Sequence, residues 1–83
     1  MKLPSAATII TNGEFSKHAW ADPSCTVSYA HPIIEVSKRF MESKSTFLFD
    51  STFEAALTLE EEGYTLQLET KRSGYTVLFY IKE

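Results

Sequence analysis

Residues 46–83 read TFLFDSTFEAALTLEEEGYTLQLETKRSGYTVLFYIKE, and this stretch decides the fold. It begins with a short β-branched and aromatic strand at 46–49. A helix is predicted over 51–62, because Ser51-Thr52-Phe53-Glu54 matches the S/T-x-x-E capping box, in which hydroxyl and carboxylate satisfy amides at the helix start. Gly63 supplies the stop signal at the other end. The pattern therefore predicts a strand followed by a capped helix.

The predicted helix carries one apolar stripe. Phe53, Ala56 and Leu57 are spaced i, i+3 and i+4, so they lie on one face of a helix. We expect this face to be buried against the sheet.

Two further strands follow the helix and form a hairpin. Leu66 and Leu68 alternate with polar residues, which predicts a strand with one face directed inward. Lys71-Arg72-Ser73-Gly74 predicts the turn, with Gly74 suited to a left-handed or bulge position. The final strand is apolar on both faces, since Tyr75, Val77, Phe79 and Ile81 point one way and Leu78 and Tyr80 point the other. One helical layer covers one side of a sheet, so we expect Leu78 and Tyr80 to remain exposed.

The first half of the chain is harder to interpret. A β-branched run at 8–11 followed by Asn12-Gly13 predicts a two-residue type I′ turn and a hairpin returning over 14–18. Residues 25–29 are expected to form another strand. The segment 32–43 fits a helix and a strand equally well, and we favour the helix because Pro32 suits a first helical turn. A strand at this place would pair with 46–49.

Together these elements predict a single α+β domain over 1–83, with one antiparallel or mixed sheet packed by the helix 51–62 and, in the helical alternative, by a second helix at 32–43. The 83 residues leave room for one modest core. The chain has a single cysteine and therefore no internal disulfide, which indicates a reducing, cytoplasmic setting. No run approaches the roughly 20 apolar residues of a spanning helix, so we expect no membrane association.

Four side chains with metal-binding or nucleophilic chemistry lie within fourteen positions: His18, Asp22, Cys25 and His31. Zinc requires three or four such ligands, but this spacing matches no finger or protease pattern. A thiol mechanism would pair Cys25 with a histidine, yet no accompanying catalytic motif is present. We therefore predict no metal site, no cofactor and no catalytic residues, and expect a protein that is not an enzyme.

Nucleic-acid binding is an alternative with limited support. The net charge of −3 gives no overall attraction to phosphate. Cations at Lys38-Arg39 and Lys71-Arg72, with Tyr75 and Tyr80 near the second pair, supply the charges and aromatic faces that single strands require. No RNP-like motif accompanies them, so we rank nucleic acid below a protein partner.

Protein binding is the function that the pattern favours. The acidic run Glu60, Glu61 and Glu62 lies where the helix dipole disfavours carboxylates, which suggests a contact patch for a basic partner. Trp20 lies beside an Asp-Pro turn, and tryptophan is enriched at interfaces as well as in cores. The predicted partner-binding residues are Glu60, Glu61, Glu62, Leu78, Tyr80 and Trp20.

The stretch Phe49-Asp50-Ser51-Thr52-Phe53-Glu54-Ala55-Ala56-Leu57 is similar to strand-to-helix junctions of many small α+β proteins, including compact phage-encoded inhibitors. This resemblance covers under half of the chain, and it implies a short intracellular domain that occupies the surface of another macromolecule. The sequence thus predicts a non-enzymatic binding module, with an inhibitor from a phage or mobile element as one form. A homodimeric accessory protein is the nearest alternative, because self-association would hide the same apolar side chains.

Overall fold

The computed structural model describes residues 5–15, 21–29 and 46–82. In this part of the chain, five strands form one sheet in the order β3-β2-β1-β5-β4, and every neighbouring pair is antiparallel. The elements are β1 (Ser5–Thr11), β2 (Cys25–Tyr29), β3 (Thr46–Phe49), α2 (Thr52–Glu61), β4 (Thr65–Arg72) and β5 (Tyr75–Lys82). The predicted α+β class, with a single sheet packed by a helix, is confirmed. Trp20 and the ambiguous segment 32–43 lie outside the described residues.

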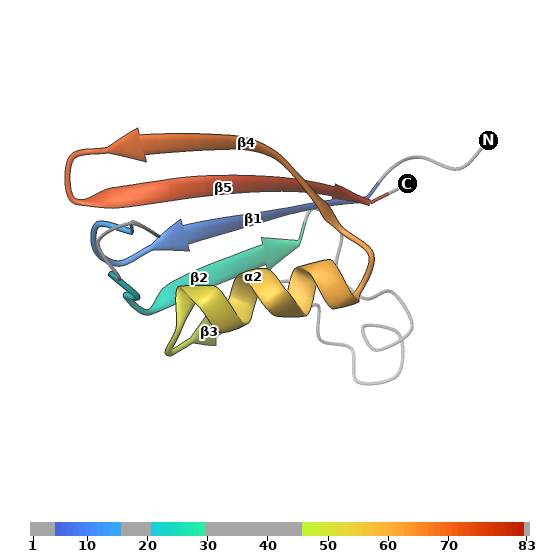
Figure 1. Ribbon diagram of the computed structural model, residues 1–83, viewed down its shortest axis with the longest axis horizontal. Helices are drawn as coiled ribbons and strands as arrows, with labels where there is room; N and C mark the ends of the chain where they lie inside the picture. The colour runs from blue at the N-terminus through green and yellow to red at the C-terminus, as the bar shows by residue number, and fades with distance from the viewer. Residues whose placement is uncertain (1–4, 16–20, 30–45, 83) are drawn as a thin grey trace.

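The helix lies over one half of one face of the sheet. It packs against β1, β2 and β3, and the β4–β5 hairpin extends beside it (Figure 1). The core between the helix and the sheet consists of Ala7, Ile9, Cys25, Val27, Ala55, Leu59, Leu78 and Tyr80. The β4 side of the sheet therefore lies outside the cover of α2, and this asymmetry creates the groove considered below.

The start of α2 is held by a residue that the capping-box pattern does not include. The hydroxyl of Ser51 accepts a hydrogen bond from the amide of Glu54 at 3.1 Å, as the pattern predicts. The same hydroxyl donates to the Asp22 carboxylate at 2.6 Å, and the amide of Phe53 donates to the other Asp22 oxygen at 3.0 Å. Asp22 thus ties the loop before β2 to the helix start.

Asp22 makes the stability of this junction depend on pH. Burial raises the pKa of Asp22, but hydrogen bonds from Ser51, Phe53 and Thr52 outweigh it, so the pKa lies below its ordinary value of 3.8. A lowered carboxyl pKa contributes stability that is present above pH 3.8 and is lost as the pH falls through the folded pKa.

We expect Asp22→Ala to lower the free energy of unfolding by about 1 kcal/mol at neutral pH, because an ionised cap is removed from a helix start. The difference from the wild type should shrink below pH 3.8. Urea unfolding followed by circular dichroism at pH 7 and near pH 2.5 measures both values. An equal difference at the two pH values would contradict a role for the Asp22 charge.

The end of α2 follows the stop signal that the sequence predicts. Gly63 has φ of +100°, and its amide donates to the carbonyl of Glu60 at 3.0 Å. The amide of Tyr64 donates to the carbonyl of Leu59 at 2.9 Å. These two bonds form a Schellman motif, in which glycine takes the left-handed position without steric cost.

The buried stripe of α2 differs from the predicted one. The buried residues are Thr52, Ala55 and Leu59, whereas Phe53 and Ala56 are half-buried and Leu57 is 55% exposed. Thr52 is tolerated in the core because its hydroxyl donates to the carbonyl of Pro23 at 2.6 Å. The helix is therefore rotated by about one position from the expected orientation.

The predicted two-residue turn after β1 is also wrong. β1 pairs with β2 with Thr11 opposite Cys25, and the loop between them is closed by the amide of Asn12, which donates to the carbonyl of Ser24 at 2.9 Å. Gly13 lacks the positive φ that a type I′ turn requires, and residues 14–15 are not part of a strand. The remaining residues of the expected return strand, 16–18, lie outside the described part.

The expectation that Leu78 and Tyr80 form an exposed surface is wrong. They are 3% and 2% exposed, because α2 lies on the face of the sheet to which these two residues point. The exposed apolar side chains of β5 belong to the opposite face, where Val77, Phe79 and Ile81 are only half-buried. A strand that is apolar on both faces does not reveal in its sequence which face the helix covers.

We call the face of the sheet opposite α2 the open face, and it carries no charge over its centre. Within the described residues no element packs on it. Leu48 is 82% exposed there, Leu68 59% and Ile10 42%. The cross-strand register gives its three central rows as Thr46, Ser28, Thr8, Phe79 and Leu68; Leu48, Thr26, Ile10, Val77 and Thr70; and Ala6, Ile81 and Thr65.

The alternation of β4 is interrupted by a bulge between Leu66 and Leu68. Leu66 lies opposite Tyr80 and therefore on the helix side of the sheet, whereas Leu68 lies opposite Phe79 on the open face. The prediction that both leucines share one inward face is wrong, because the extra residue Gln67 reverses the pattern of the strand. The hairpin closes at Ser73-Gly74, with Gly74 at φ of +88°, whereas Lys71 and Arg72, which were predicted to be part of the turn, belong to β4.

Candidate functional site

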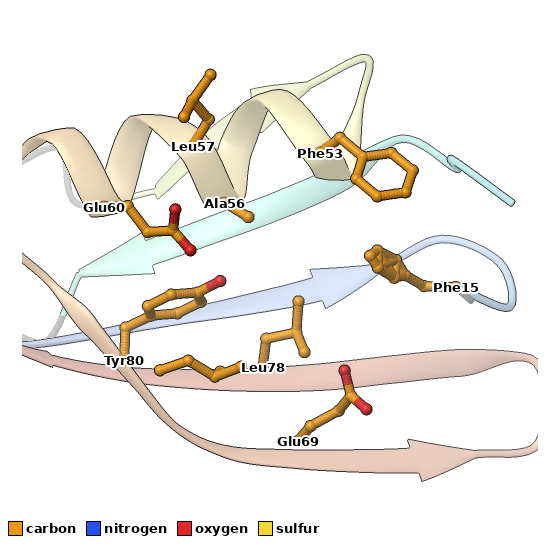
Figure 2. Close-up of a pocket in the computed structure, with 9 residues that line it drawn as sticks. Phe15, Phe53, Ala56, Leu57, Glu60, Glu69, Leu78 and Tyr80 are labelled. Carbon is orange, nitrogen blue, oxygen red and sulfur yellow. The ribbon is translucent and has the colours of Figure 1, made fainter. Parts of the chain in front are cut away.

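A groove of about 310 Å³ runs between α2 and the β4–β5 hairpin (Figure 2). Its volume lies at the lower end of the range of small binding pockets, roughly 300–1,000 Å³. Seven of the nine lining residues are apolar or aromatic, and the other two are glutamates. The lining residues are Phe15, Phe53, Ala56, Leu57, Glu60, Leu66, Glu69, Leu78 and Tyr80.

One wall of the groove is a second stripe of the helix. Phe53, Ala56, Leu57 and Glu60 follow the spacing i, i+3, i+4 and i+7, so they share one face of α2. The sequence pattern identified three of these residues as core. The stripe is real, but it faces the groove, and its continuation to Glu60 gives an apolar wall that ends in a carboxylate.

One end of this wall is closed by an aromatic pair. The rings of Phe15 and Phe53 lie 5.0 Å apart with an interplanar angle of 51°, a tilted arrangement favoured between aromatic side chains. Phe15 comes from the loop after β1 and is 4% exposed. This contact fixes the helix start to the β1 loop and orients the stripe toward the hairpin.

The opposite wall owes its charge to the register of the β4–β5 hairpin. Glu69 lies opposite Leu78, and the pairing is regular from there to the turn, so Glu69 points to the helix side of the sheet. In a regular strand Leu66, three positions away, would point to the other face, because successive positions alternate. The bulge between Leu66 and Leu68 places Leu66 on the same side as Glu69, and the glutamate enters the groove from the strand side (Figure 2).

The floor of the groove contains Tyr80, whose hydroxyl points toward α2 and the Glu60 carboxylate in Figure 2. Tyr80 is 2% exposed, yet its hydroxyl makes no hydrogen bond to any residue that the structure describes. Burial raises the pKa of Tyr80, and the charges of Glu60 and Glu69 raise it further. The charges of both glutamates thus act on one buried hydroxyl, for which the described residues provide no hydrogen-bond acceptor.

The acidic run at the end of the helix does not act as one patch. Glu60 lines the groove, whereas Glu62 accepts a hydrogen bond from the hydroxyl of Tyr29 at 3.1 Å. The side chain of Glu61 is exposed and makes no hydrogen bond to another described residue. Burial, together with Glu62, raises the pKa of Tyr29 to about 12. Of the three predicted carboxylates, only Glu60 therefore belongs to the groove.

The residues considered for metal binding or catalysis are not assembled in the described structure. His18 and His31 lie outside the described residues. Asp22 is engaged at the helix start, and Cys25 is buried in β2 with the pKa of its thiol raised by burial. A raised pKa favours the neutral thiol, whereas a nucleophile or a metal ligand requires the thiolate. Among the described residues no group of three or more histidine, cysteine or acidic side chains could hold a metal ion.

The residues considered for nucleic-acid binding do not form one surface. Lys71 lies opposite Thr76 on the helix side, whereas Arg72 lies opposite Tyr75 on the open-face side. Tyr80 is buried and offers no face for a base to stack on. Lys38 and Arg39 lie outside the described residues. The described part of this set is therefore divided between two sides of the sheet.

Sequence reasoning missed Phe15, Leu66 and Glu69 as residues of the site. Glu60 could have been linked to the apolar stripe, because it continues the helical spacing from Phe53. Alternation with Leu66 and Leu68 placed Glu69 on the polar face, whereas its direction follows from the number of residues between it and the turn at Ser73-Gly74.

The one helix in the described ranges is far shorter than a membrane crossing requires. Comparison with known proteins found no matching family model, no matching curated protein and no matching solved structure.

Proposed function

We propose that this chain is a small non-enzymatic protein-binding module that receives part of another protein in the groove between α2 and the β4–β5 hairpin. The observation that carries this proposal is the groove itself, which has an apolar floor and two walls from different elements. An apolar groove that is exposed to water raises the free energy of the folded domain. Binding of a complementary surface buries the groove and lowers this free energy.

The neighbouring edge of the sheet supports the same use. β4 is the edge strand, and seven of its eight residues are exposed. An edge strand presents unpaired backbone amides and carbonyls that an incoming segment meets beside the groove. We also propose a cytoplasmic location, which is supported by the single cysteine and by its burial as a free thiol.

The test is quantitative capture with a matched pair of variants. Leu57→Arg adds a long side chain to the groove wall, and Leu48→Arg makes the same change on the open face; both positions are exposed, so both variants should fold. The tagged wild type and each variant are used to capture partners from the native cell. We expect a protein that the wild type and Leu48→Arg retain and that Leu57→Arg loses. An identical set of captured proteins in all three cases would contradict the groove as the binding site.

Homodimerisation is a second candidate, and the open face favours it. A surface with an uncharged centre and with Leu48, Leu68 and Ile10 exposed is of the kind that a second copy covers in a symmetric dimer. The same two variants separate the candidates. Sedimentation equilibrium of a homodimer that joins open faces should show a dimer for the wild type and Leu57→Arg and a monomer for Leu48→Arg.

A further inference from the structure

We infer that the groove recognises a protein segment in which an arginine is flanked by apolar residues, with the guanidinium held between Glu60 and Glu69. This inference deepens the proposed function and rests on it. Its basis is the combination of an apolar groove, two carboxylates on opposite walls and the buried Tyr80 hydroxyl, which has no hydrogen-bond partner among the described residues.

The charge of the groove is unbalanced within the described residues. The described lining residues include two glutamates and neither lysine nor arginine. Neither Glu60 nor Glu69 makes an ion pair or a side-chain hydrogen bond to another described residue. Both carboxylates attract a cation that lies in the groove between them. The complementary occupant is therefore positively charged at this point.

The buried donor points to the same occupant. Buried polar groups in proteins almost always have a hydrogen-bond partner, and the Tyr80 hydroxyl has none in the described structure. A cation that draws the two carboxylates inward brings a glutamate oxygen to the hydroxyl, so that the bound state satisfies the donor. In the free groove no described residue accepts a hydrogen bond from it.

The shape and chemistry of the lining favour arginine over lysine. Phe53, Leu57 and Leu66 offer an apolar path along which an aliphatic stem lies, while the charged head reaches the carboxylates. A guanidinium has five N–H donors in a planar fork, so it can bond carboxylates on two sides, whereas an ammonium is a compact and strongly hydrated point charge. Apolar neighbours of the arginine would cover the remaining floor near Leu78 and Phe15.

The probe for the test is a random dodecapeptide library displayed on phage and selected on the folded full chain. We expect the enriched sequences to contain an arginine between apolar residues. For an enriched peptide made synthetically, Glu60→Gln with Glu69→Gln should weaken binding roughly 10- to 100-fold, because hydrogen bonds to charged groups contribute this much. Glu61→Gln is the matched control, since Glu61 is exposed on the same helix outside the groove, and it should leave the affinity unchanged.

Three results would overturn the inference. The first is enrichment of peptides without a basic residue, or of no peptide at all. The second is unchanged binding by the double glutamine variant. The third is a dimer of the wild type that Leu57→Arg abolishes, because a second copy would then occupy the groove. If Leu57→Arg loses a captured protein that the double glutamine variant retains, the proposed function stands and the arginine inference fails.

Discussion

Replacing Leu59 with alanine should lower the free energy of unfolding by about 2–5 kcal/mol, because it removes a buried side chain and leaves a cavity between α2 and the sheet. Leu59 is 1% exposed and belongs to the core cluster. A domain of this length has a total stability on the order of 4–12 kcal/mol, so the loss is a large fraction of the whole. Urea unfolding followed by circular dichroism provides the measurement.

The matched control for this variant is Leu57→Ala on the same helix. Leu57 is 55% exposed on the groove side, so its truncation should cost less than about 1 kcal/mol. Equal losses at the two positions would mean that α2 is rotated toward the stripe that the sequence pattern predicted. The comparison therefore tests the orientation of the helix and, through it, the existence of the groove.

Thr11→Val should lower the free energy of unfolding by about 1–3 kcal/mol, because valine keeps the shape but removes a hydrogen-bond acceptor from the core. The Thr11 hydroxyl oxygen accepts from the amide of Thr76 at 2.7 Å and donates to the carbonyl of Gly13 at 2.5 Å. The side chain continues the ladder between β1 and β5 beyond Ile10 and Val77, the last paired residues. Amide hydrogen exchange at Thr76 should become faster in the variant.

The control is Thr8→Val, the same change on the open face of the same strand. Thr8 is half-buried between Ser28 and Phe79, where a β-branched apolar side chain is well accepted, so we expect a change within about 0.5 kcal/mol. Unchanged protection of the Thr76 amide in Thr11→Val would contradict the proposed role of the hydroxyl.

The features that the sequence predicts correctly are those that depend on residues close in the chain. The N-cap at Ser51, the stop at Gly63 and the turn at Gly74 each follow from the backbone preferences of a few neighbouring residues. The strands at 25–29 and 46–49 are also located correctly, because β-branched and aromatic residues dominate them.

The features that the sequence does not predict depend on distant partners. Asp22 accepts hydrogen bonds at the start of α2 from a loop about thirty positions earlier in the chain, and no local sequence pattern predicts these bonds. The carbonyl of Pro23 accepts a hydrogen bond from the Thr52 hydroxyl, so this polar residue can occupy a buried position in the core. These two contacts help to decide which stripe of the helix faces the sheet.

Three predicted partner-binding residues, Glu60, Leu78 and Tyr80, line the groove, but the groove itself was not predicted, for the same reason. Leu78 and Tyr80 were expected at the surface but are buried. The sequence of a strand that is apolar on both faces does not indicate which face a helix covers. The groove exists because α2 is centred on the half of the sheet formed by β1, β2 and β3. That placement is a property of the assembled fold, and only Glu60 of the predicted acidic run could be recognised in advance as part of the site.

The register of the β4–β5 hairpin implies that the number of residues between Glu69 and the turn, and not their identity, controls the acidity of the groove. Three residues, Thr70, Lys71 and Arg72, separate Glu69 from the turn at Ser73-Gly74, and this count places Glu69 opposite Leu78 on the helix side. Deletion of Gln67 would only remove the bulge, because Leu66, Leu68 and Glu69 would keep their cross-strand partners. Loss of the single codon for Thr70 would instead place Glu69 opposite Val77 on the open face and Leu68 opposite Leu78, which would leave Glu60 as the one carboxylate among the described lining residues. A one-residue deletion would thus alter the binding preference of this fold without replacing any charged residue.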